Sequence, residues 1–158
     1  MSKAFAVIGA GYALLSSVAL AEPPYEGLVN QTIKHTVGWY VDNTYDNSVR
    51  TKIIKTCNTS KPIYVMSPPY AFAAFSVFGC DNGKVVNNFV LTLRHAINEW
   101  QVLSNDEIQE DELNELAVVG DTLFITYLTE GPNDAFCCPS VKITHRYQIT
   151  SRGIQFLN

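Results

Sequence analysis

The sequence lacks an excess of basic residues. Lys and Arg number 11 against 15 Asp and Glu, so the formal net charge is −4 at pH 7. Non-specific binding to nucleic acid or to an anionic membrane depends on basic patches, so this balance argues against both partners. Internal repeats, low-complexity tracts and linkers are also absent from the 158 residues. The length therefore predicts a single domain with room for a core of its own.

Acidic residues are absent before Glu22, and this segment has the pattern of an export signal. Lys3 precedes an apolar and small-residue run, Ala4–Leu20, and Ala19-Leu20-Ala21 places small residues where signal peptidase cuts. We therefore expect a cleaved signal peptide over residues 1–21 and one extracytoplasmic domain over residues 22–158, periplasmic or secreted. Cleavage would leave 10 basic and 15 acidic groups, a formal charge of −5.

A retained membrane anchor is the alternative, because the apolar run approaches the roughly 18 to 20 residues that span a bilayer. The two prolines after Glu22 and the polar sequence beyond them favour cleavage. No cysteine follows the cleavage site, so the signal is not that of a lipoprotein. We expect no stable membrane anchor after cleavage.

The remaining sequence predicts an α+β fold, mostly antiparallel β, built from β-hairpins with few short helices. Lys34–Val41 and Val49–Cys57 have the β-branched and aromatic composition of strands, and turn-forming residues separate them. Three prolines between residues 58 and 69 predict a surface crossing, because proline is excluded from internal strands.

Two hairpins are predicted further along the chain. Tyr70–Phe78 and Lys84–Leu93 are apolar runs on either side of Asp81-Asn82-Gly83, although the alanines of the first run also suit a helix. The Asp-Asn-Gly turn has too few oxygen ligands for a calcium loop. A second hairpin joins residues 116–119 to 123–128 through Gly120-Asp121.

The segment between these hairpins is ambiguous. The apolar spacing of residues 94–103 suits a helical face, whereas Trp100-Gln101-Val102 alternates as a strand does. Residues 106–115 carry six acidic side chains and no basic one, which predicts a solvated face or a short acidic helix.

Val141–Ile149 alternates most regularly, and its apolar face includes His145. We expect a strand in which His145 is a buried neutral histidine with one hydrogen-bond partner.

Four cysteines, Cys57, Cys80, Cys137 and Cys138, predict disulfides in an exported protein, and four cysteines allow three pairings. A Cys57–Cys80 bridge is preferred, although it leaves Cys137 with its neighbour Cys138 in a strained ring. The two-residue spacer of a redox dithiol is absent, and no familiar zinc pattern is present. We therefore predict no metal site and no cofactor.

Adjacent cysteines in a loop between two strands are the least common feature of the chain. The loop, followed by a strand ending in Arg146-Tyr147-Gln148-Ile149, resembles the C-terminal signature of the LppP/LprE family of small bacterial envelope proteins. The matching loop residues are Gly131, Pro132, Asn133, Asp134, Cys137, Cys138, Pro139 and Ser140. The resemblance covers residues 120–149 and implies a bacterial source and an extracytoplasmic, β-rich domain. It implies no catalytic residue, and the lipid-attachment cysteine of many relatives is absent here.

Three functions are compatible with these features. The first is a non-enzymatic binding or structural module for an unknown envelope protein or small ligand, with Trp39, Tyr40 and Tyr45 as candidate contacts. The second is a thiol–disulfide or hydrolytic enzyme, for which Ser140 and His145 are the only local pair, on opposite faces of a strand. The third is a small exported inhibitor or immunity-type protein that meets a basic enzyme through its acidic run. We predict no catalytic residue.

Overall fold

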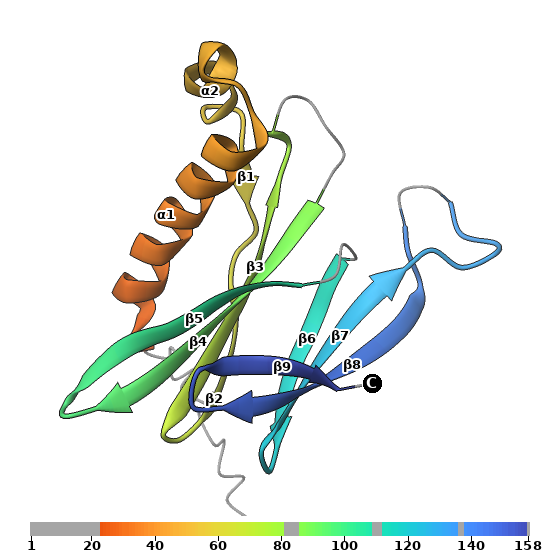
Figure 1. Ribbon diagram of the computed structural model, residues 1–158. Coiled ribbons are helices and arrows are strands. Elements are labelled where there is room, and N and C mark those ends of the chain that lie inside the picture. The colour runs from red at the N-terminus through yellow and green to blue at the C-terminus, as the bar shows by residue number, and fades with distance from the viewer. Residues whose placement is uncertain (1–22, 81–85, 109–111, 136–137, 158) are drawn as a thin grey trace, which may run out of the picture.

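The computed structural model describes residues 23–80, 86–108, 112–135 and 138–157. They form three layers: a long helix, a five-stranded antiparallel sheet and a four-stranded antiparallel sheet (Figure 1). This architecture confirms the α+β, mostly antiparallel class. The expected signal peptide and the Asp81-Asn82-Gly83 turn lie outside the described residues. In the part that is described, no helix is long and apolar enough to cross a bilayer.

Two helices precede the strands along the described chain. The elements are α1 (Glu26–Thr44), α2 (Asn47–Ile53), β1 (Asn58–Thr59), β2 (Ile63–Ser67), β3 (Tyr70–Phe78), β4 (Val86–Ala96), β5 (Glu99–Ile108), β6 (Glu112–Val119), β7 (Thr122–Thr129), β8 (Val141–Thr150) and β9 (Gly153–Leu157). The first sheet has the order β1-β3-β4-β5, and β2 pairs with the edge of β3 that β1 also uses. The second sheet has the order β6-β7-β8-β9.

The strand expected over Lys34–Val41 is absent, because these residues belong to helix α1. Its buried residues Val29, Ile33 and Thr36 recur at the spacing of one helical face, and that face packs on the first sheet. Burial of this face outweighs the β-propensity of the aromatic and β-branched residues at the end of the segment. Trp39 points away from the core and is 56% exposed.

The expectation of a strand over Val49–Cys57 is also wrong, because its first half lies in helix α2 and turn residues follow. The side chain of Arg50 fixes its position, because Nε donates to the carbonyl of Tyr45 at 2.7 Å and Nη2 to that of Asp42 at 2.5 Å. Asp42 lies near the end of α1, where carbonyl groups lack partners within the helix. Arg50, within α2, therefore caps the end of α1.

Strand β3 is the centre of the fold because it is buried on both faces. Ala71, Ala73, Phe75 and Val77 pack beneath α1, whereas Phe72 and Ala74 face the second sheet. Two-sided burial explains why this strand is a continuous apolar run rather than an alternating one. Every residue of β3 pairs with a residue of β4, which confirms the predicted hairpin and excludes the helix alternative.

The two undecided segments are strands. Residues 94–103 complete β4 and begin β5, with a two-residue turn at Ile97-Asn98. Among the described residues of the acidic run there is no helix, since they end β5 and begin β6. The surface crossing expected before residue 69 contains β2, which Pro62 precedes and Pro68 follows. Proline is thus kept out of the strand itself, but the crossing is part of the sheet.

Strand β8 and the hairpin of β6 with β7 are where the sequence placed them. The prediction that His145 is buried is wrong, because the residue is half-buried. Its ring lies between those of Tyr127 and Phe156, with centroids 5.4 Å away in both cases. The first part of β8 extends past the cover of the first sheet, and Val141 and Ile143 are exposed there as well.

Candidate ligand site between the two sheets

The loop that carries the sequence motif is organised by Asp134. Its Oδ2 accepts hydrogen bonds from the backbone N–H of Gly131 at 2.7 Å and of Ser140 at 2.8 Å, and the Ser140 hydroxyl donates to Oδ1 at 2.7 Å. These donors, the Gly131 N–H foremost, lower the pKa of the Asp134 carboxyl because they stabilise its charged form. Pro132 and Asn133 form the exposed turn, and Pro139 is half-buried at the far side of the loop. The carboxylate joins the two ends of the loop, which is a structural role.

The preferred disulfide is present: Cys57 is bonded to Cys80, 23 residues away. The bond joins the segment after α2 to the end of the β3 region, and Cys80 is buried against the core beneath α1. Cys137 lies outside the described residues. No cysteine in the described part of the chain is free.

Ser140 and His145 are held by different partners. The Ser140 hydroxyl donates to the Asp134 carboxylate, whereas the His145 ring stacks edge-on between two aromatic rings. In the described ranges no hydrogen bond joins the two side chains. Nor do these ranges contain a group of three or more His, Cys, Asp or Glu side chains placed to hold a metal ion.

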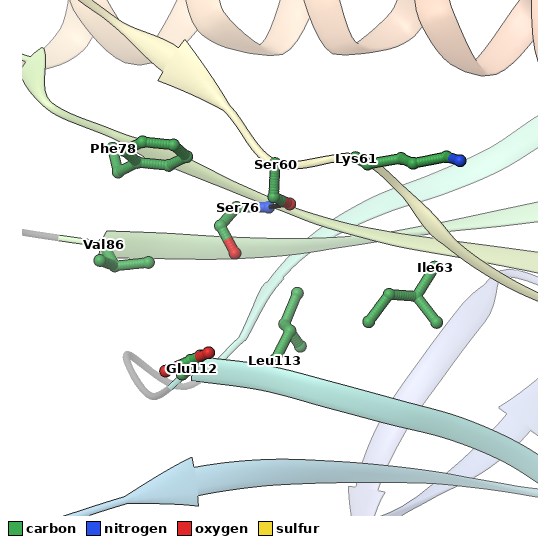
Figure 2. Close-up of a pocket in the computed structure, with 8 residues that line it drawn as sticks. All are labelled: Ser60, Lys61, Ile63, Ser76, Phe78, Val86, Glu112 and Leu113. Atoms are coloured by element: carbon green, nitrogen blue, oxygen red, sulfur yellow. Dashed lines mark hydrogen bonds between the residues drawn. The ribbon is translucent and has the colours of Figure 1, made fainter. Parts of the chain in front are cut away.

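A cavity of about 360 Å³ opens between the sheets, beside the end of β3 and the start of β4 (Figure 2). Pockets that hold small organic ligands occupy roughly 300 to 1,000 Å³. The cavity has four apolar side chains, two serines and two charged residues in its lining. They are Ile63, Phe78, Val86 and Leu113, with Ser60, Ser76, Lys61 and Glu112. Among the described residues that line it, none belongs to the motif loop.

Hydrogen bonds fix the polar wall of this cavity. The backbone N–H of Ser76 donates to the hydroxyl oxygen of Ser60 at 2.9 Å, and the N–H of Ser60 donates to the carbonyl of Ser76 at 3.0 Å. The Ser76 hydroxyl donates in turn to Oδ1 of Asn88 at 2.7 Å, in the interior of the sheet. The Ser60 oxygen is the acceptor in this bond, and among the described residues its hydroxyl hydrogen has no acceptor, so it can donate to a ligand.

The two charged residues lie at the rim of the cavity. Lys61 and Glu112 are both exposed, and no ion pair of either residue occurs within the described part of the chain. Figure 2 shows the side chain of Lys61 extending away from the apolar wall, whereas Glu112 lies at the first residue of β6, beside Leu113. A ligand can therefore bury an apolar body between the sheets while its polar group stays near water.

Two local features of the sequence create the opening. Ser60-Lys61-Pro62 interrupts the sheet edge between β1 and β2, so neither of these strands pairs with Phe75 or Ser76 of β3. An irregularity in the pairing of β6 between Leu113 and Glu115 changes the direction of that strand near its start. Sequence reasoning found the prolines but not the cavity, because its walls come from four strands distant in sequence.

Comparison with family models, with curated proteins and with solved structures finds no match to this chain.

Proposed function

We propose that this chain is an exported, non-enzymatic binding module that holds a small amphipathic molecule between its two sheets. The observation that carries the proposal is the cavity of about 360 Å³, with an apolar wall and a hydrogen-bonded serine pair facing it. Apolar walls with a few fixed polar groups are typical of small-molecule sites.

The location outside the cytoplasm is part of the same proposal. A disulfide between Cys57 and Cys80 favours an oxidising compartment, and the apolar run ahead of Glu22 favours export. The resemblance of residues 120–149 to LppP/LprE proteins agrees with an envelope protein. Under this proposal the motif loop stabilises the second sheet and takes no part in binding.

A neutral apolar fluorophore, N-phenyl-1-naphthylamine, tests the site. We expect saturable binding with increased emission, because the probe leaves water when it enters the cavity. Leu113→Trp enlarges a half-buried side chain of the wall, and Val86→Trp does so from the opposite sheet. Both substitutions should weaken binding at least tenfold while the protein stays folded.

Ile54→Trp is the matched control, because Ile54 directly follows α2, is exposed, and does not line the cavity. It should leave the affinity for the probe unchanged. The proposal is wrong if the probe fails to bind, or if neither Leu113→Trp nor Val86→Trp weakens its binding. If the probe binds and both wall substitutions weaken its binding, mass spectrometry of an organic extract of the purified protein would identify a natural ligand retained in the cavity.

A further inference from the structure

Ile97 has the most unusual position of any described apolar residue. It occupies the tip of the β4–β5 hairpin with 94% of its surface exposed, and its φ is +49°. A β-branched residue rarely adopts positive φ, and two-residue hairpin turns of this kind prefer Asn, Asp or Gly. The chain thus places an isoleucine where both water and the backbone disfavour it. Such a combination points to a contact made by the side chain.

Further side chains lie at this end of the first sheet, on the face that α1 packs against: Trp100 contacts the buried cluster beneath the helix, and His95 is its strand partner. Pro68, Pro69, His95 and Trp100 line a shallow depression of about 440 Å³. The ring of His95 lies 5.1 Å from that of Trp100, which is the strand partner of His95 in the hairpin. Met66, in β2 on the other side of β3 from this hairpin, is 57% exposed. We call Met66, Pro68, Pro69, His95, Ile97 and Trp100 the apolar end.

The chain enters the domain at this end. Tyr25, immediately before α1, stacks on Trp100 with ring centroids 4.8 Å apart. In sequence, the apolar run Ala4–Leu20 stops five residues before Tyr25. Five residues span at most about 18 Å when fully extended. While that run occupies a bilayer, as an export signal does before cleavage, Tyr25 stays within about 18 Å of the membrane surface, with the Trp100 ring beside it.

The described part of the acidic run lies at the opposite end of the molecule from the apolar end. The described carboxylates of the acidic run, Asp106, Glu107, Glu112 and Glu115, belong to the far end of β5 and the first half of β6. Figure 1 shows these strand ends opposite the β4–β5 turn and the start of α1. The apolar end carries the single exposed charges Arg94 and Glu99 beside the tip. Because these two charges are of opposite sign, the apolar end does not meet the repulsion from an anionic surface that the acidic end would meet.

We propose that the apolar end is a lipid-facing surface, which inserts Ile97 into the membrane interface and places Trp100 at the level of the headgroups. Tryptophan is enriched at that depth because its ring is apolar and its N–H is polar. The contact is peripheral and reversible, since one small apolar surface gives weak membrane affinity. It is independent of the cavity between the sheets.

The test uses the mature chain from Glu22, which retains the buried residues on both faces of the first sheet, and vesicles of zwitterionic phosphatidylcholine. We expect the protein to float with the vesicles. In a Trp39→Phe background Trp100 is the one remaining tryptophan, and brominated acyl chains should quench its fluorescence. Ile97→Asn should weaken binding roughly tenfold, the effect of losing one partly inserted isoleucine.

Stability separates this effect from misfolding. Asparagine tolerates positive φ, so Ile97→Asn should unfold at the same or a higher temperature than the parent protein while it binds lipid less tightly. Ile54→Asn is the control, because Ile54 is a surface isoleucine in the α2 region, away from the apolar end. It should leave vesicle binding unchanged.

Four results would overturn the proposal. They are no flotation of the parent protein at millimolar lipid, equal losses for both asparagine variants, no quenching of Trp100, or a dimer that Ile97→Asn dissociates in the absence of vesicle binding. The last result would assign the surface to a second copy of the chain.

Discussion

Gly153 of β9 lies directly against the side chain of Ser104 in β5, where the edges of the two sheets meet. A Cβ at position 153 would fall 2.7 Å from the Cβ of Ser104 and 3.2 Å from Oδ2 of Asp106. Rotation of the Ser104 side chain away from this contact would break a hydrogen bond, because its hydroxyl donates to that same Asp106 oxygen at 2.6 Å. The backbone of Gly153 also has φ of +135°, which side chains rarely adopt. Glycine is therefore required for the sheets to close on this side.

Substitution of Gly153 by alanine should destabilise the protein by about 3 kcal/mol, since it combines a steric clash with backbone strain. The free energy of unfolding in urea measures the effect. Gly38→Ala is the control, because Gly38 lies within α1 and has no heavy atom within 4 Å of an added Cβ. It should instead stabilise the protein by up to about 1 kcal/mol. Equal effects of the two substitutions would contradict the close contact.

Loss of the Cys57–Cys80 disulfide should also destabilise the fold. The bond closes a loop with a sequence separation of 23 residues. Chain entropy then assigns it a stabilisation of about 3 kcal/mol. The double variant Cys57→Ala, Cys80→Ala should lose that amount in urea unfolding, and reduction of the parent protein should have no larger effect. Peptide mapping without reductant would contradict the pairing if it recovered either cysteine linked elsewhere.

The strands were largely predictable from sequence, and the reasons are local. Val141–Thr150 alternates in hydrophobicity, and glycine turns mark the ends of β6 and β7, so the pattern and the turn chemistry agree. Both faces of β3 are buried, yet its length and the following turn still favoured a strand over a helix.

Helix α1 was missed because composition and periodicity conflict there. Val37, Trp39 and Tyr40 favour strands by composition, whereas Val29 and Ile33 mark a helical face. Periodicity was the stronger signal, since the helix covers the sheet with this face. The cavity had no comparable signal. Ser60 and Leu113 are 53 positions apart, and only the meeting of two sheets places both on its wall.

Packing of α1 on the sheet predicts a difference between its two faces. Val29 is fully buried in the cluster beneath α1, so Val29→Ala should destabilise the protein by about 2 kcal/mol through lost burial and a residual cavity. Gln31, two positions later, is exposed, and Gln31→Ala should change stability by less than about 0.5 kcal/mol. Thermal unfolding followed by circular dichroism compares the two variants. Similar losses would mean that α1 does not dock through this face.

The Asp134 carboxylate makes the motif loop sensitive to acid. Hydrogen bonds from Gly131 and Ser140 lower its pKa below the ordinary value of 3.8 in the folded protein. A group with a lowered folded pKa contributes stability that is fully present above its unfolded pKa. That contribution is lost as the pH falls through the folded pKa. The loop should therefore stay closed at neutral pH and open only below pH 3.8.

Asp134→Asn tests the sign of this dependence. At pH 6 the variant should unfold at a lower temperature than the parent, and the difference should shrink as the pH falls below 3.8, because the parent then loses the same charge. In the parent protein the amide protons of Gly131 and Ser140 should titrate together with one midpoint below 3.8. Ser140→Ala keeps the carboxylate but removes the hydroxyl donor, so it should move the midpoint of the Gly131 amide upward. A parent midpoint at or above 3.8, or no response to Ser140→Ala, would show that these hydrogen bonds do not hold the charge.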